Sequence, residues 1–241
     1  MTTPSEVNGR ALPDSDLAAP APPAPAVPEP PDPEFTVLGA RPVRHAAAPM
    51  LALDLQVSEP SGRPIYMIAL SIQLMIDPAR RRYDDATRAR LVELFGAPER
   101  WAVTTRSLVW SQLDVVVPAF TGATTVAVPI QCNYDLELAA AKYLRSLPDG
   151  EAPLALHFNG MVYYPGRDGG LQMVLLPWSK SIDFRMPVSV WHETIDHYYP
   201  ATTWVAVHSA TLDALQQRKV QRGAATFDAC IAALLKETGG D

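Results

Sequence analysis

The chain has 241 residues, of which 48% are hydrophobic and 19% charged, which predicts a soluble globular protein with one large domain, or with one domain and a small appendage. Its net charge of −6 argues against general nucleic-acid binding. Two cysteines are too few for a disulfide framework, an all-cysteine zinc site or a four-thiolate iron–sulfur cluster. The sequence lacks both an apolar run of membrane-spanning length and a recognisable secretory signal, so we expect a cytoplasmic protein.

Residues 1–34 differ from the rest of the chain in composition. They hold ten of the 24 prolines, and six acidic residues against one arginine. Such a segment buries too little apolar surface to offset an ordering cost of about 1–2 kcal/mol per residue. We predict a disordered leader, extended and partly polyproline II over 18–33. Whether it is a ligand for a proline-binding module, a spacer or a segment without a specific role stays open.

From residue 35 onward, apolar residues alternate with the period of two that is typical of β-strands. The clearest run covers 126–138, where we expect every second side chain to point into the core. Pro129 lies within that run and has no N–H to donate, so we predict a sheet edge or a bulge there. The alternating residues are Val126, Val128, Ile130, Cys132, Tyr134, Leu136 and Leu138.

Further strands are predicted around 51–57, 68–76, 107–117, 154–164, 171–175 and 182–188. The turn residues at 60–64 predict that the first two form an antiparallel hairpin. About eight strands with few helices between them favour antiparallel sheets, and we expect a β-sandwich over 35–188 in preference to a barrel. Each strand, including 171–175 with Leu171, Met173 and Leu175, is expected to bury its alternating apolar residues.

Helices are predicted at three places. Asp84 or Asp85 is a suitable N-cap for an inserted helix near 84–95, and Gly96 for its end. Segment 139–147 is either a short helix or a distorted strand end. Three short helices form a C-terminal extension, 189–241, which we expect to pack on the sandwich. Their caps and inward residues are Trp191, Ile195 and Tyr198 before Pro200; Ser209, Leu212 and Leu215 before Gly223; and Thr226, Phe227, Cys230, Ile231 and Leu234.

No catalytic or metal-binding motif emerges. His192 and His197 are five residues apart, about 140° around a helix, whereas the histidines of a zinc protease motif are four apart. P-loop, dinucleotide and nucleophile-elbow motifs are missing. Cys132 and Cys230 are interpreted as small buried apolar residues. We therefore assign no catalytic residue, metal or cofactor.

Two groups of residues are candidates for contact with a partner. Segment 79–106 has seven arginines against four acidic residues, and a second basic group follows at the end of a predicted helix. Aromatic residues, which are enriched in interfaces, cluster between 178 and 204. Solvated helix faces and a seam between sheet and helices are the alternatives. The candidates are Arg80, Arg81, Arg82, Trp178, Trp191, Tyr199, Arg218, Lys219 and Arg222.

Five stretches resemble an uncharacterised bacterial family associated with gene clusters for uptake nickel–iron hydrogenases in high-GC Gram-positive bacteria. They are 35–50 (FTVLGARPVRHAAAPM), 81–101 (RRYDDATRARLVELFGAPERW), 117–144 (VPAFTGATTVAVPIQCNYDLELAAAKYL), 169–178 (GGLQMVLLPW) and 186–204. The resemblance covers roughly 35–237 and transfers no catalytic or ligand residue. It implies an accessory role, with a hydrogenase subunit or maturation factor as partner.

The residues limit that role. A nickel or iron carrier needs a site dense in histidine or cysteine, and an electron carrier needs cluster thiolates. Five scattered histidines and two inward cysteines supply neither. We therefore expect a non-catalytic protein-binding or assembly module. The alternatives are a hydrolase-like enzyme using His192, His197 or Asp183 between the sandwich and the C-terminal helices, and a structural subunit of a larger complex.

Overall fold

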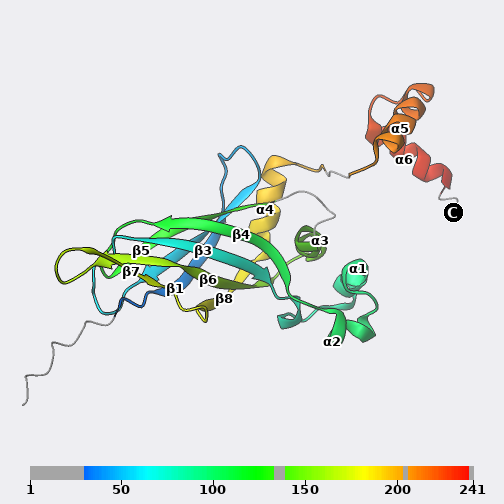
Figure 1. Ribbon diagram of the computed structural model, residues 1–241. Coiled ribbons are helices and arrows are strands. Elements are labelled where there is room, and N and C mark those ends of the chain that lie inside the picture. Colours follow the sequence, from blue (N-terminus) through cyan, green and yellow to red (C-terminus); the bar gives the residue numbers. More distant parts are fainter. Residues whose placement is uncertain (1–29, 133–138, 203–205, 239–241) are drawn as a thin grey trace, which may run out of the picture. The chain divides into compact units, whose positions relative to one another are not determined.

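The computed structural model describes residues 30–132, 139–202 and 206–238. These residues form eight antiparallel strands in two sheets, with helices inserted between strands and following them (Figure 1). The predicted fold class, a mainly β sandwich with an inserted helix and C-terminal helices, is confirmed. One sheet has the order β1-β2-β5, and the other β4-β3-β6-β7, with β8 also paired to β6. The strands are β1 (Glu34–Pro42), β2 (Met50–Ser58), β3 (Met67–Ile76), β4 (Leu108–Val117), β5 (Ala123–Gln131), β6 (Glu151–Pro165), β7 (Leu171–Leu175) and β8 (Ser181–Pro187).

The inner faces of the two sheets meet in one hydrophobic core. The alternating residues of β2 and β3 are at most 2% exposed, as their period of two predicts. Phe35 of β1 stacks on Phe158 of β6 with ring centroids 4.2 Å apart, so this aromatic pair joins the two sheets. β1 has no counterpart among the predicted strands, because a bulge between Val37 and Gly39 interrupts its alternation.

The strongest predicted strand is confirmed as far as the structure describes it. Val128, Ile130 and Cys132 are at most 2% exposed, whereas Pro129 and Gln131 are exposed. Residues Tyr134, Leu136 and Leu138 lie outside the described residues. Pro129 lies in β5 at a sheet edge, as predicted.

The predicted hairpin between the first two strand segments is wrong. β2 pairs with β1 and β5, while β3 pairs with β4 and β6, so the connection between them crosses from one sheet to the other. The buried carboxylate of Glu59 holds this crossing, since it accepts hydrogen bonds from Ser61 Oγ and from the backbone N–H of Arg63 at 2.8 Å. Turn residues predict that the chain reverses, but they do not specify which strand it joins.

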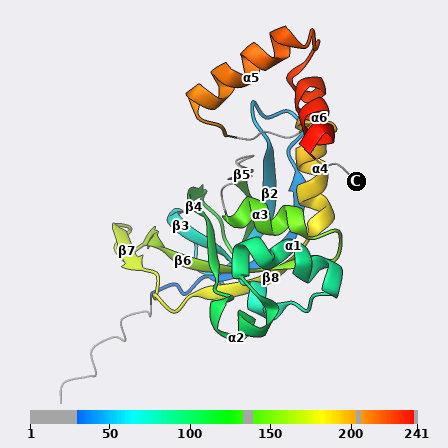
Figure 2. The same cartoon turned by 90° about the vertical axis from the view of Figure 1, so that its right-hand side faces the viewer.

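The inserted helices lie at the end of the five-stranded sheet where β3 ends and β6 begins. Asp84 caps α1 (Asp85–Phe95) by accepting a hydrogen bond from Thr87 N at 2.7 Å, and Gly96 ends it, both as predicted. Segment 139–147 contains a helix, α3 (Ala139–Ser146), which packs beside α1 (Figure 2). The remaining insertions are η1 (Pro78–Arg80), η2 (Pro98–Arg100) and α2 (Trp101–Thr104).

The helix after the last strand, α4 (Val188–Tyr198), completes the core with Trp191 and Ile195. Its last residue contacts the loop that joins β1 to β2. The Tyr198 hydroxyl oxygen lies 2.8 Å from Ala46 O and 3.1 Å from Val43 O, and it accepts a hydrogen bond from Ala46 N at 3.0 Å. One side chain of α4 thus anchors a loop about 150 residues earlier in the chain.

The last two helices, α5 (Ser209–Gln221) and α6 (Phe227–Thr238), pack against each other. Thr226 caps α6 by accepting a hydrogen bond from Ala229 N at 3.1 Å, as predicted. Cys230 is buried, whereas Leu212 and Ile231 are exposed on this pair. The expected packing of segment 189–241 on the sandwich stays a prediction.

Candidate functional site

The outer face of the five-stranded sheet divides into a polar half and an apolar half. The strand register aligns Val116, Ala69, Met161 and Leu175 in one row across β4, β3, β6 and β7. The next row toward the β6–β7 turn is also apolar or aromatic. We call this half the apolar outer patch; it consists of Met67, Ala69, Val116, Met161, Tyr163, Leu171, Met173 and Leu175.

The apolar outer patch is open to solvent on the described residues. Val116, Leu171, Met173 and Leu175 are 64–69% exposed, although each has neighbours of the same kind. Single exposed apolar residues are normal on a protein surface, but a contiguous apolar area of several side chains usually marks an interaction site. The patch is therefore the main functional candidate.

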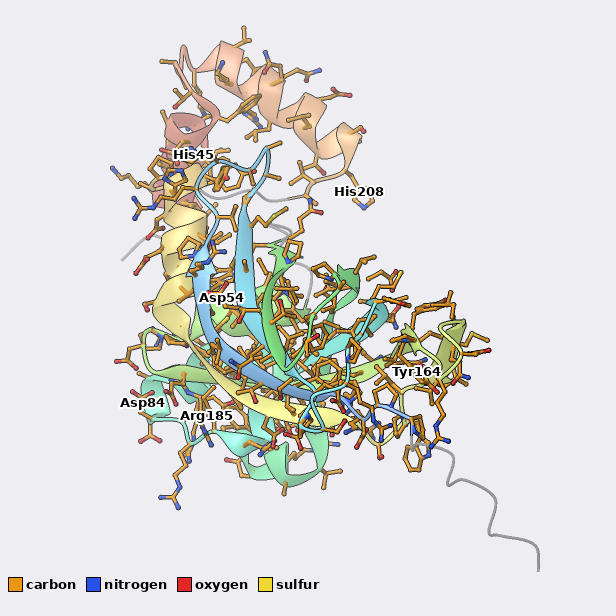
Figure 3. The ribbon with its side chains drawn as sticks, turned by 90° about the vertical axis from the view of Figure 1, so that its left-hand side faces the viewer. His45, Asp54, Asp84, Tyr164, Arg185 and His208 are labelled. Atoms are coloured by element: carbon orange, nitrogen blue, oxygen red, sulfur yellow. The ribbon has the colours of Figure 1, made fainter. Side chains whose placement is uncertain are left out.

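The other half of the same face is polar. Where β3 continues from Ala69 to Ser71, the outer row becomes Asp114, Ser71 and Asn159. The next row is Gln112, Gln73 and His157, and the row after it combines the apolar Val109, Met75 and Ala155 with Asp183 of β8, so this half is mainly polar. Arg185 of β8 lies on the same face. Figure 3 shows Arg185 toward the β8 end of this sheet and Tyr164 toward the β6–β7 turn. His157 faces outward, as its strand position predicts.

A bulge between β7 and β8 displays a tryptophan at the boundary between the two halves of this face. Leu176 N donates to Gly160 O at 3.0 Å, and Phe158 N donates to Lys180 O at 2.9 Å, so residues 177–179 oppose a single residue of β6. Trp178 lies in this loop and is 93% exposed. Bulges often redirect a side chain at a functional site. This one presents a large aromatic ring to solvent, and Trp178 remains a candidate for partner contact.

The expected burial of Leu171, Met173 and Leu175 is wrong, because these residues face outward. In the segment 171–176 both faces carry apolar residues, Gln172 being the exception, and Val174 and Leu176 are the ones that pack on the core. Alternation alone cannot decide between two apolar faces. The signal that could have revealed the patch is this apolar character on both faces of one strand.

The arginines of the first basic segment have different surroundings. Arg80 makes a bidentate ion pair with Asp183, in which Nη2 lies 2.7 Å from Oδ2. This pair raises the pKa of Arg80 and lowers that of Asp183. Arg81 is largely buried and donates to the carbonyl oxygens of Glu151 and Asp149 at 2.8 Å. Arg82 is exposed, so of these three arginines it stays the candidate for contact with a partner.

Arg81 borders a buried tyrosine pair. Its guanidinium lies 5.9 Å from the ring centroid of Tyr83. The Tyr83 hydroxyl donates to Pro78 O at 2.7 Å and lies 2.9 Å from the Tyr143 hydroxyl, so Tyr143 must donate to Tyr83. Burial is the main cause that raises the pKa of both tyrosines. The cluster is structural, since it connects η1 to α3.

The aromatic candidates of the C-terminal region also differ from one another in how deeply they are buried. Trp191 is 4% exposed and belongs to the core, so it is no longer a candidate for partner contact. This location agrees with the alternative of a seam between sheet and helices. Tyr199 follows α4 and is partly buried.

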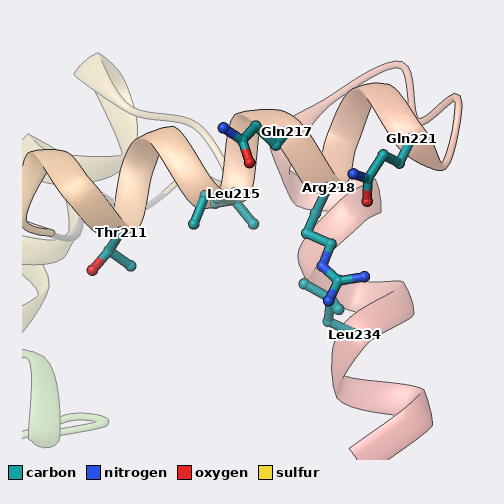
Figure 4. A pocket seen from close by; sticks show the side chains of 7 residues that line it. Thr211, Leu215, Gln217, Arg218, Gln221 and Leu234 are labelled. Atoms are coloured by element: carbon teal, nitrogen blue, oxygen red, sulfur yellow. The ribbon is translucent and has the colours of Figure 1, made fainter.

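The basic residues of α5 lie on the helix pair. Arg222 makes a bidentate ion pair with Glu237, with Nη1 2.6 Å from Oε1. Lys219 Nζ lies 5.2 Å from the ring centroid of Phe227. Arg218 lines an open groove of about 520 Å³ together with Thr211, Leu215, Gln217, Gln221 and Leu234 (Figure 4). The groove contains one charged side chain, and the described residues bring no acid or nucleophile into it.

The residues of the enzyme alternative each have a separate partner. His192 Nε2 lies 2.8 Å from Leu147 O, and His197 Nε2 lies 3.1 Å from Arg44 O. Asp183 pairs with Arg80. Among the described residues, no hydrogen bond joins any two of these three. Nor does any group of three or more His, Cys, Asp or Glu side chains in the described ranges lie where it could hold a metal ion.

Both cysteines are buried free thiols, as predicted. Burial raises the pKa of the Cys132 thiol to about 12, so at neutral pH it is protonated and unreactive. Within the described segments, no helix combines the length and the apolarity that crossing a membrane requires.

Comparisons with known proteins give a family but no activity. No curated protein matches the sequence. A Bordetella pertussis crystal structure that carries the name ApaA is 12% identical, with a TM-score of 0.26 over 66% of this chain and 97% of that one, and this likeness is too low to support an argument. A family model matches residues 30–241, which include every strand and helix described above. The chain therefore belongs to that family, DUF6084, a family of unknown function.

Proposed function

We propose that this protein is a non-catalytic protein-binding module whose contact surface is the apolar outer patch, extended by Trp178. The observation that carries the proposal is the row Val116, Ala69, Met161 and Leu175, which makes one half of a sheet face apolar across four strands. Burying such a surface against a partner gains about 25 cal/mol for each Å² of apolar area.

The chemistry of the patch specifies the kind of partner. Its side chains are aliphatic, thioether and aromatic, and they carry no charge. A complementary surface must therefore be apolar at its centre, with a polar rim that meets Asp114 and Asn159. A hydrogenase subunit or maturation factor as that partner is part of this proposal, and it is supported by the sequence resemblance alone.

The test is affinity capture from the native host with matched variants. Met173→Lys and Leu175→Lys place a charge at the centre of the patch, whereas Gln73→Lys places the same charge on the polar half of the same face. All three positions are on the outer face, so each variant should have nearly the same free energy of unfolding as the wild type.

We expect the wild type and Gln73→Lys to recover the same stoichiometric partner, and the two patch variants to lose it. Hydrogenase subunits among the recovered proteins would support the more specific assignment. Equal recovery by all four proteins would overturn the assignment of the surface. Recovery of no stoichiometric partner by the wild type would overturn the binding function.

A further inference from the structure

The free edge of β7 is a second feature that neither the core nor the proposed partner surface uses. β7 is the last strand of the order β4-β3-β6-β7, and among the described strands it pairs only with β6. An unpaired edge exposes backbone N–H and C=O groups that can pair with another strand. The question is which backbone groups point to that edge.

Two hydrogen bonds show which backbone groups of β7 point to the free edge. Leu176 N donates to Gly160 O at 3.0 Å, and Gly166 N donates to Gly170 O at 2.7 Å. In an antiparallel pair, the backbone groups of alternate residues point to the same side. The even positions of β7 therefore pair with β6, and the N–H and C=O groups of Leu171, Met173 and Leu175 point to the free edge.

The other edge strands carry a proline or a charged residue that disfavours such pairing, whereas β7 carries neither and is protected only by its short length. Natural sheets protect their edges with proline, charge or bulges. β1 has Pro42, β5 has Pro129, β4 has Asp114, and β8 has Asp183 and Arg185. The sequence of β7 is LQMVL, without charge, proline or glycine, and its pairing with β6 is regular.

We propose that a second copy of this chain binds at this edge, with the two β7 strands antiparallel about a twofold axis at Met173. The two five-stranded sheets then join into one continuous sheet. This inference goes beyond the proposed function, because it uses the backbone edge of β7 and leaves the outer side chains free.

The sequence of β7 is complementary to itself in this register. The axis places Met173 opposite Met173 of the second copy, and Leu171 opposite Leu175. These residues are the ones whose backbone groups face the edge, so all three positions form hydrogen-bonded pairs. Although the whole chain has a net charge of −6, no charged residue of β7 opposes another in this contact.

The size of the contact sets the expected affinity. A five-residue strand buries less than the about 800 Å² per partner of a standard stable interface. We therefore expect a weak dimer that forms over roughly micromolar to millimolar protein concentrations. Both apolar outer patches stay exposed and lie next to each other in the joined sheet.

Analytical sedimentation of the full-length protein over a range of concentrations tests the proposal. Two variants distinguish the loss of a backbone hydrogen bond from a change of side chain. Met173→Pro removes an N–H that points to the free edge and leaves the pairing with β6 intact. Met173→Thr changes the same side chain and keeps the N–H. We expect a concentration-dependent dimer for the wild type and Met173→Thr, and a monomer for Met173→Pro.

Cysteine cross-linking tests the register without depending on the proline variant. The two native cysteines are buried, so an introduced thiol reacts against a low background. Residue 173 and its copy lie about 5.5 Å apart between Cα atoms, within disulfide range, so Met173→Cys should cross-link with itself on oxidation. Leu171→Cys and Leu175→Cys should each fail alone, because each lies about 13 Å from its own copy, and should cross-link when mixed.

A monomer at every concentration would overturn the proposal. So would a dimer that Met173→Pro leaves unchanged, or one in which Leu171→Cys cross-links with itself, since that result indicates a parallel register. Because Met173→Lys and Leu175→Lys place a charge on β7 itself, the partner capture is repeated with Met173→Pro, which breaks the dimer and keeps an apolar residue on the outer face. Partner recovery by Met173→Pro together with its loss in the lysine variants separates the partner surface from the dimer contact.

Discussion

Gly160 of β6 and Ala69 of β3 approach each other so closely that a Cβ atom on the glycine would lie 2.1 Å from the Ala69 carbonyl oxygen. Gly160 also has a φ of 155°, a conformation that other residues rarely adopt. Its carbonyl oxygen accepts a hydrogen bond from Leu176 N immediately before the bulge that carries Trp178, where the edge partner of β6 changes from β8 to β7. The close approach therefore makes glycine a requirement at the point where the sheet edge is interrupted.

Replacement of this glycine should be costly. We expect Gly160→Ala to lower the free energy of unfolding by about 3 kcal/mol or more, because a steric clash adds to backbone strain. Gly39→Ala is the matched control, since nothing lies within 4 Å of a Cβ at that position. Chemical denaturation measures both variants, and an equal effect would show that the close approach is absent in solution.

The inward direction of β5 predicts opposite effects for adjacent residues. Ile130 is fully buried and Gln131 is exposed. Ile130→Asp places a charge in the core and should abolish cooperative unfolding, or lower stability by more than about 4 kcal/mol. Gln131→Asp should change stability by less than about 0.5 kcal/mol. Thermal unfolding followed by circular dichroism distinguishes the two, and similar losses would contradict the strand direction.

The buried tyrosine pair predicts an unequal effect of removing either hydroxyl. Tyr83→Phe leaves Pro78 O and the Tyr143 hydroxyl without their partner, at a cost of about 1–3 kcal/mol. Tyr143→Phe removes one donor to a hydroxyl that still donates to Pro78 O, so it should cost about 1 kcal/mol or less. Denaturant titration of both variants tests the hydrogen-bond direction, and a larger loss for Tyr143→Phe would reverse it.

The same pair predicts loss of stability at high pH. Burial raises the pKa of Tyr83 and Tyr143 above the ordinary value of 10.0, so the folded protein keeps both protons while the unfolded chain loses them. Their contribution to stability is therefore complete below pH 10.0 and is lost as the pH rises above it. Ultraviolet titration of tyrosinate should show a wild-type fraction that ionises only on unfolding. The double variant Tyr83→Phe/Tyr143→Phe should lack this fraction.

Thiol reactivity tests the burial of both cysteines. Cys132 and Cys230 are 2% and 0% exposed, and burial raises the pKa of Cys132 to about 12. A thiol reagent at neutral pH should modify neither residue in the native protein and both after denaturation. Rapid native labelling of one cysteine, identified by mass spectrometry, would show that its element opens in solution.

Features that depend on neighbouring residues in the sequence could be predicted. The alternation in β5, the edge position of Pro129 and the Asp84 cap each follow from a few consecutive residues and their physical preferences. A helix is excluded over β5 because its apolar residues would recur every three to four positions. At the start of α1, the Asp84 side chain accepts a hydrogen bond from a backbone N–H that the helix itself leaves without a partner.

Features that depend on strand register could not. The pairing of β2 and β3 with different strands, the outward face of Leu171 and the bulge at Trp178 are set by partners far away in the sequence. The apolar outer patch arises only when β4, β3, β6 and β7 are aligned, so the apolar residues on both faces of β7 indicate an exposed apolar strand but not the extent of the patch. Likewise, Arg80 and Arg82 belong to one run of three arginines, and only the fold brings Asp183 to Arg80.

The contact of Tyr198 with the loop after β1 has a consequence for synthesis on the ribosome. The Val43 and Ala46 carbonyls emerge first, whereas their partner on α4 follows about 150 residues later. At translation rates of about 5–20 residues per second, this delay lasts roughly 8–30 s. Throughout that interval the first hairpin lacks its anchor. The loop between β1 and β2 can therefore take its native position only after α4 has left the exit tunnel.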